Sequence, residues 1–158
     1  MLDAPVDAWY VWVGLAVVSL SLLGTVAALP TQPPPNAATV ADAVDRAATA
    51  TPPATTTVRT GADEIALTPT TVSLRNDAGT ASATFAFGTV TPVTTESALW
   101  PLLKGTSPGA VFDDPEAFRQ ALVEARAQKG QRRWRPADGP VRVRHLAWRG
   151  VETTLVGH

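Results

Sequence analysis

Cysteine is absent from this chain of 158 residues, and histidine occurs only twice, at His145 and His158. Disulfides, thiolate metal sites and cysteine nucleophiles are therefore excluded, and two histidines are too few for a histidine-based metal centre. The sequence also lacks the fingerprints of a phosphate-binding loop, a serine hydrolase, a zinc protease or a dinucleotide fold. We therefore expect a protein that is not an enzyme and that binds no metal and no cofactor.

Charge is absent from the 22 positions between Ala8 and Leu29. As a helix this run would be about 33 Å long, enough to cross a hydrocarbon core of roughly 30 Å. The sequence thus predicts a single-pass transmembrane anchor with lipid as its partner. The alternative is a cleaved signal peptide, because Val26-Ala27-Ala28 resembles a small-residue cleavage site. Against this alternative, the residues before the apolar run are acidic, whereas a signal peptide begins with basic residues.

Basic residues are lacking around this run, and the first one is Arg46. The positive-inside rule orients a membrane span by the Lys and Arg residues near its ends, so it gives no orientation here. The segment after the run is rich in Thr, Pro and Ala, as extracellular stalks are. We expect a membrane location with the C-terminal domain outside the cytoplasm, where nucleic acid is not a partner.

The remaining sequence predicts an α+β fold with an antiparallel sheet and one main packed helix. We expect three parts: an N-terminal segment with the anchor over 1–29, a stalk with a short helix over 30–54, and an α+β domain over 55–158. The short helix spans 36–50, and its thin apolar face leaves open whether it packs on the domain or frays in the stalk.

Local signals place the elements of the α+β domain. Alternating polar and apolar residues predict strands, and the turn sequence Asn-Asp-Ala-Gly makes 70–88 a hairpin with Phe85 and Phe87 on one face. Asp114-Pro115-Glu116 predicts the start of the main helix. A second hairpin is predicted over 141–156, turning at Arg149-Gly150.

The densest charge cluster is the first candidate interaction surface, and it comprises Lys129, Arg132, Arg133, Trp134 and Arg135. Arginine and an aromatic ring together suit anionic headgroups, a glycan or the acidic face of a partner protein. The alternative is a solvated loop after a helix. A second candidate is a helix-packing face of small residues, Ser21, Gly24 and Ala28, which would let helices approach closely.

Two further groups have ordinary explanations. Glu96, Asp113, Asp114 and Glu116 would form an acidic patch, but helix capping accounts for the last three, and the oxygen spacing of an EF-hand loop is absent. His145 lies in an alternating strand, where a packed imidazole is the common case. Neither group predicts a catalytic or metal site.

An apolar N-terminal helix, a small middle helix and a β-rich head resemble the plan of type IV pilins and pseudopilins. More particularly, the chain resembles small haloarchaeal membrane proteins found beside archaeal type IV pilus or Tad-like secretion components. The likeness is carried by residues 1–7, MLDAPVD, and residues 143–151, VRHLAWRGV. The chain departs from the pilin pattern in two ways. No basic leader precedes Ala8, and no acid lies within the apolar run. The resemblance implies an accessory role rather than a filament subunit.

We therefore expect a membrane-anchored, non-enzymatic accessory or pilin-like subunit of a pilus or secretion assembly. Its partners would be other membrane subunits of that assembly, with no small-molecule substrate. The alternative is a stand-alone binding module of the cell envelope that captures a ligand through the Arg-rich C-terminal region.

Overall fold

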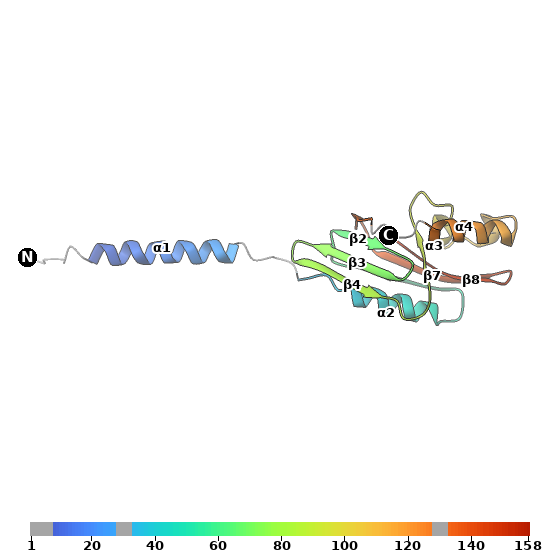
Figure 1. Cartoon of the computed structure of the whole chain (residues 1–158), viewed down its shortest axis with the longest axis horizontal. Coiled ribbons are helices and arrows are strands. Elements are labelled where there is room, and N and C mark those ends of the chain that lie inside the picture. Colours follow the sequence, from blue (N-terminus) through green and yellow to red (C-terminus); the bar gives the residue numbers. More distant parts are fainter. Residues whose placement is uncertain (1–7, 28–32, 128–132) are drawn as a thin grey trace, which may run out of the picture. The chain divides into compact units, whose positions relative to one another are not determined.

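The computed structural model describes residues 8–27, 33–127 and 133–158. The chain divides into two compact units, Met1–Pro33 and Pro34–His158. The first unit contains α1 (Ala8–Ala27), and every other element belongs to the second unit (Figure 1).

In the part of the chain that the structure describes, no helix combines the length and the apolar character needed to cross a membrane. This finding contradicts the transmembrane anchor expected over 8–29. It also contradicts the expected single-pass membrane location.

Helix α2 (Ala37–Ala48) forms as the sequence predicts and packs in the core of the second unit. The Asn36 side chain accepts a hydrogen bond from the Thr39 N–H at 3.2 Å and so caps the first turn. One face of the helix is buried, comprising Ala37, Val40, Ala41, Ala43, Val44 and Ala47. The small alanines let the helix approach the strands closely, so that a thin apolar face suffices for packing.

The first sheet, sheet A, has the strand order β1-β7-β8-β5. Its strands are β1 (Ala54–Val58), β7 (Val141–Trp148), β8 (Val151–Gly157) and β5 (Thr91–Val93). The hairpin of β7 and β8 turns at Arg149 and Gly150, whose φ angles of 45° and 80° suit the right-handed twist of a two-residue turn. Strand β5 pairs with β8 in parallel, so the expectation of a single antiparallel sheet is incomplete.

The second sheet, sheet B, is antiparallel with the order β4-β3-β2-β6. Its strands are β4 (Gly79–Thr84), β3 (Thr71–Asn76), β2 (Glu64–Leu67) and β6 (Arg135–Pro136). The predicted turn between β3 and β4 forms, but β4 ends before the two phenylalanines. The Asp45 carboxylate accepts hydrogen bonds from the N–H groups of Ala86 and Phe87 at 3.0–3.1 Å. Phe85 is therefore buried, whereas Phe87 is 60% exposed.

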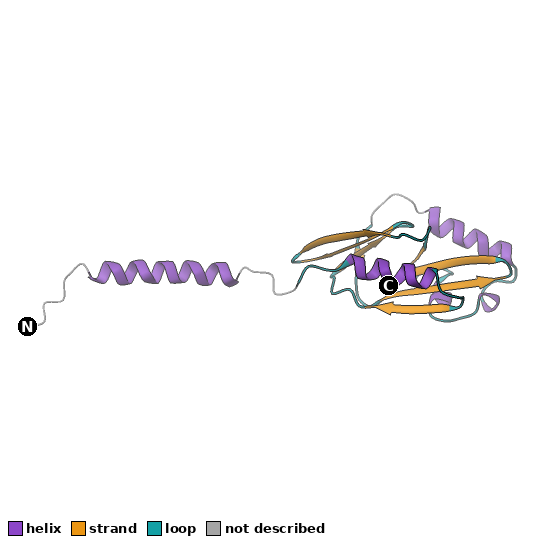
Figure 2. Ribbon diagram, turned by 90° about the horizontal axis from the view of Figure 1, so that it is seen from below, coloured by secondary structure: helices purple, strands orange, loops and turns teal. Residues whose placement is uncertain are grey.

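Three short helices complete the second unit: α3 (Trp100–Leu103), the 3-10 helix η1 (Pro108–Ala110) and α4 (Pro115–Ala127). Apolar side chains of α3 and α4 form one core with Val93, Leu146 and Leu155 of sheet A. A separate core joins α2 to both sheets through residues such as Ile65 and Val143. An α+β fold is compatible with this architecture, although several packed helices replace the single one expected (Figure 2).

Helix α2 packs against both sheets. This helix contacts β1 and β4, the first strand of each sheet, as well as β3, β7 and β8. It therefore fills the space between the sheets along one side. The strands at the other ends of the two orders are β5 and β6, and α4 contacts β5.

Candidate functional site

A cleft of about 1160 Å³ lies in the second unit, and we call it the β5–β6 cleft. It is lined by Ile65, Leu67, Thr68, Pro69, Pro92, Val93, Thr94, Thr95, Glu96, Trp100, Ala125, Arg133, Arg135, Pro136, Asp138, Gly139, Pro140, Arg142 and His158. These residues come from β2, β5, β6, β7, α3 and α4 and from the segments beside them, including the residue after β8. The site therefore forms only when the two sheets have assembled.

The apolar part of the cleft comes from side chains that extend the two cores to their open edges. Ile65 and Leu67 are alternate residues of β2, so both face the space between the sheets. Val93 and Trp100 belong to the other core and reach the cleft from β5 and α3. An apolar ligand group would contact these side chains.

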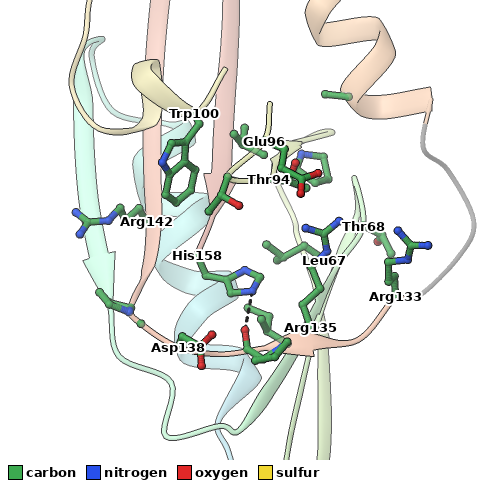
Figure 3. Close-up of a pocket in the computed structure, with 18 of the residues that line it drawn as sticks. Leu67, Thr68, Thr94, Glu96, Trp100, Arg133, Arg135, Asp138, Arg142 and His158 are labelled. Carbon is green, nitrogen blue, oxygen red and sulfur yellow. Dashed lines mark hydrogen bonds between the residues drawn. The ribbon is translucent and has the colours of Figure 1, made fainter. Parts of the chain in front are cut away.

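The basic part of the cleft comes from Arg133 and Arg135, which also alternate along an extended segment. Arg133 is exposed and Arg135 is half-buried. Among the described residues, no carboxylate oxygen lies within the 4.0 Å ion-pair distance of either guanidinium. In Figure 3, Arg135 extends from β6 into the middle of the cleft, and Arg133 lies to one side of it. Two cations therefore face the cleft without a described counter-ion.

Other charged residues occupy the margins of the cleft. Glu96 lies in the loop after β5, on the wall opposite Arg135, and its carboxylate points into the cleft (Figure 3). Asp138 lies below His158, and the guanidinium of Arg142 points away from the centre. The charges that face the interior are thus two arginines on one wall and one glutamate on the other.

His158 lies on the wall of the cleft. Its Nε2–H donates to the carbonyl oxygen of Pro136 at 3.1 Å, and its Nδ1 is buried and has no partner among the described residues. Burial lowers the pKa of His158 below its ordinary value, and the positive charge of Arg135 lowers it further. The Pro136 hydrogen bond and the charge of Asp138 oppose that shift. The ring is therefore sensitive to the charge near Arg135.

The structure divides the basic cluster predicted from the sequence. Lys129 and Arg132 lie outside the described residues. Arg133 and Arg135 line the cleft, whereas Trp134 packs against Arg75 of sheet B. The strand-like alternation of residues 133–135 sends the middle side chain away from its two neighbours. Two of the five predicted residues are thereby brought together in one site.

The predicted helix-packing face lies in and after α1. The hydroxyl of Ser21 donates to the Val17 carbonyl oxygen at 2.8 Å. Gly24 lies within the helix, and Ala28 lies outside the described residues. None of these residues belongs to the lining of the β5–β6 cleft.

The four acidic residues considered in the sequence do not gather. The Asp114 carboxylate caps α4 by accepting the Ala117 N–H at 2.8 Å, and Glu116 forms an ion pair with Arg119 at 3.1 Å. Asp113 is exposed, and Glu96 lies in the cleft. Within residues 8–27, 33–127 and 133–158, no group of three or more His, Asp or Glu side chains is placed to hold a metal ion.

His145 has a separate environment on the β7–β8 hairpin. Its Nδ1 lies 3.0 Å from the Thr154 hydroxyl, and its Nε2 lies 3.0 Å from a Glu152 carboxylate oxygen. The imidazole is buried and is not part of the cleft lining. Its two partners lie on the neighbouring strand, so the contacts connect β7 to β8.

Sequence reasoning missed most of the cleft. His158 and Trp100 carry no local signal for a site, and Glu96 was considered only as a cation ligand. Arg133 and Arg135 were found because they form part of a dense basic run. The missing information was the pairing of β5 with β8 and of β6 with β2, which joins distant segments.

Comparison with known proteins identifies the family. Residues 3–146 match the family of unknown function DUF7283. The chain belongs to this family. No curated protein and no solved structure matches the chain significantly. The family description names no activity, and nothing in it connects the chain to pilins, so the resemblance to pilus-associated proteins stays a prediction.

Proposed function

We propose that this DUF7283 protein is a binding module whose β5–β6 cleft takes a ligand with an anionic group and an apolar part. The observation that carries the proposal is that Arg133 and Arg135 face an open cleft with no described carboxylate in ion-pair distance. Unpaired guanidinium groups are good donors to carboxylates and phosphates, often with two parallel hydrogen bonds.

The rest of the cleft supports the same class of ligand. Its volume of about 1160 Å³ is close to the range of roughly 300–1,000 Å³ that small-molecule sites occupy. Ile65, Leu67, Val93 and Trp100 offer apolar contact beside the two arginines. This combination of an apolar surface with a few fixed polar groups is typical of ligand sites.

The proposal corresponds to the binding-module alternative of the sequence analysis, without a cell-envelope location. It includes no reaction and no cofactor. The accessory role in a pilus or secretion assembly stays a prediction, because no contact or surface of the described residues favours it over the cleft.

The experiment follows the two histidines by NMR while sodium hexanoate is added to the full chain at constant ionic strength. A carboxylate bound at Arg135 offsets the positive charge that lowers the pKa of His158, so we expect the pKa of His158 to rise with ligand. His145 lies outside the cleft and serves as the internal control, since its resonance should not follow the hexanoate concentration.

Two charge-matched variants complete the test. R133S/R135S should lose the response of His158 to hexanoate, whereas R46S/R119S removes the same charge outside the cleft lining and should keep it. A His158 pKa that stays constant in wild type up to saturating hexanoate, or an equal response in both double variants, would refute the proposed site.

A further inference from the structure

Glu96 is an acid of the β5–β6 cleft whose carboxylate lies on the side opposite the two arginines. It lies on the wall opposite Arg135, and its carboxylate points into the interior (Figure 3). No described cation lies within 4.0 Å of it, so Glu96 and Arg135 share the cleft without pairing directly. The space between them holds opposite charges on its two walls.

The loop that carries Glu96 is fixed by its own hydrogen bonds. The Ser97 N–H donates to the Thr94 carbonyl oxygen at 3.0 Å, which closes a turn around Glu96. The Trp100 N–H donates to the Ser97 carbonyl oxygen at 2.9 Å, and the Ser97 hydroxyl accepts the Leu99 N–H at 3.2 Å. The backbone of Glu96 is therefore held between β5 and α3, and its position on the wall does not depend on a ligand.

A carboxylate in this position affects which anions can bind. It repels a ligand that carries only negative charge, and it attracts a cationic group on a ligand whose anion already contacts the arginines. Asp138, the other acid of the lining, lies beside His158 rather than on the wall opposite Arg135. The arrangement therefore favours a molecule with both charges, separated by an apolar segment that contacts Ile65 and Leu67.

We infer that the ligand of this cleft is zwitterionic, with its anionic group on Arg133 and Arg135 and its cationic group on Glu96. The inference rests on the proposed function and names the class of ligand for the same site. Glu96 is the specificity-determining residue, since it selects the zwitterion over an anion of the same length.

The test measures binding of two matched series to the full chain by calorimetry or by the NMR shift of His158. One series comprises linear ω-amino acids of increasing length, and the other comprises the n-alkanoates of the same lengths. In wild type, at the best length, the ω-amino acid should bind about threefold tighter than the alkanoate, as a partly exposed ion pair allows. E96Q should bring this ratio close to one.

Control variants separate this inference from the proposed function. E124Q neutralises an exposed glutamate of α4 outside the cleft lining and should keep the wild-type ratio. R133S/R135S should weaken both series by at least about tenfold, as expected for lost charged hydrogen bonds. Binding of both series that is insensitive to R133S/R135S would overturn the proposed function.

Three other results would overturn the zwitterion alone. The first is equal affinity of the two series in wild type. The second is a preference for the ω-amino acid that E96Q leaves intact, and the third is such a preference that D138N abolishes and E96Q does not. In each of these cases, alkanoate binding that still requires Arg133 and Arg135 would support the proposed anion site.

Discussion

The guanidinium carbon of Arg75 lies 4.6 Å from the ring centroid of Trp134, and neither residue lines the β5–β6 cleft. Arg75 also forms an ion pair with Glu64 of the neighbouring strand. Trp134 is half-buried and is flanked in sequence by the two arginines of the cleft. The indole therefore fixes the segment that carries Arg133 and Arg135.

This contact predicts that Trp134 and its arginine neighbours have different roles. W134A removes a half-buried ring and a cation–π contact, so it should lower the free energy of unfolding by about 1–3 kcal/mol. R133S/R135S should change it by less than about 1 kcal/mol, because neither guanidinium has a described ionic partner. Urea unfolding of the full chain measures both values. Equal losses in the two variants would show that the arginines are structural.

The helix α4 offers a prediction with a control one residue away. Leu122 is 4% exposed in the core shared with Phe118, whereas Val123 is 64% exposed. L122A should cost about 2–5 kcal/mol, because it removes buried methyl groups and leaves a cavity. V123A should cost less than about 0.5 kcal/mol. Thermal or urea unfolding distinguishes them, and comparable losses would mean that α4 does not pack on sheet A as described.

The elements with local signals were predictable from the sequence. The helix start at Asp114 and the turn at Arg149-Gly150 form as expected, because each depends on residues within four positions of one another. The hairpin expected over 70–88 extends too far, because β4 ends at Thr84 and the N–H groups of Ala86 and Phe87 donate to Asp45 of α2 instead.

The cleft was not predictable in the same way. Strands β5 and β6 have three and two residues, too few for periodicity to show. Pro92 and Pro136 within them also read as breaks rather than strands. Their pairing with β8 and β2 brings Glu96 and His158 to the arginines, and only the assembled sheets contain that information.

Gly157 gives a prediction about the edge of sheet A that borders the cleft. A Cβ added to Gly157 would lie 2.5 Å from the Val93 carbonyl oxygen and 2.8 Å from Cδ2 of Leu103. The backbone oxygen cannot yield without disturbing the pairing of β5 with β8, so G157A should cost about 1–3 kcal/mol.

Gly139 is the matched control, because an added Cβ there meets nothing within 4 Å. G139A should therefore leave the free energy of unfolding within about 0.5 kcal/mol of wild type. If G157A unfolds at the same urea concentration as G139A, the close approach of β5 to the end of β8 is not present in solution.

His158 makes the stability of the second unit depend on pH in a defined direction. Burial lowers the pKa of His158 below its ordinary value of 6.5, so the unfolded chain takes up the proton at a higher pH than the folded chain does. Around and just below pH 6.5 the unfolded state thus binds more protons, and the free energy of unfolding rises with pH there. This contribution is complete above the ordinary pKa and is lost as the pH falls through the folded-state value.

H158F cannot take up a proton, so its unfolding free energy between about pH 5 and pH 8 should fall less steeply on acidification than that of wild type. Urea titrations of both chains at each pH measure the difference. Identical pH profiles for wild type and H158F would mean that the imidazole is not buried against the cleft wall.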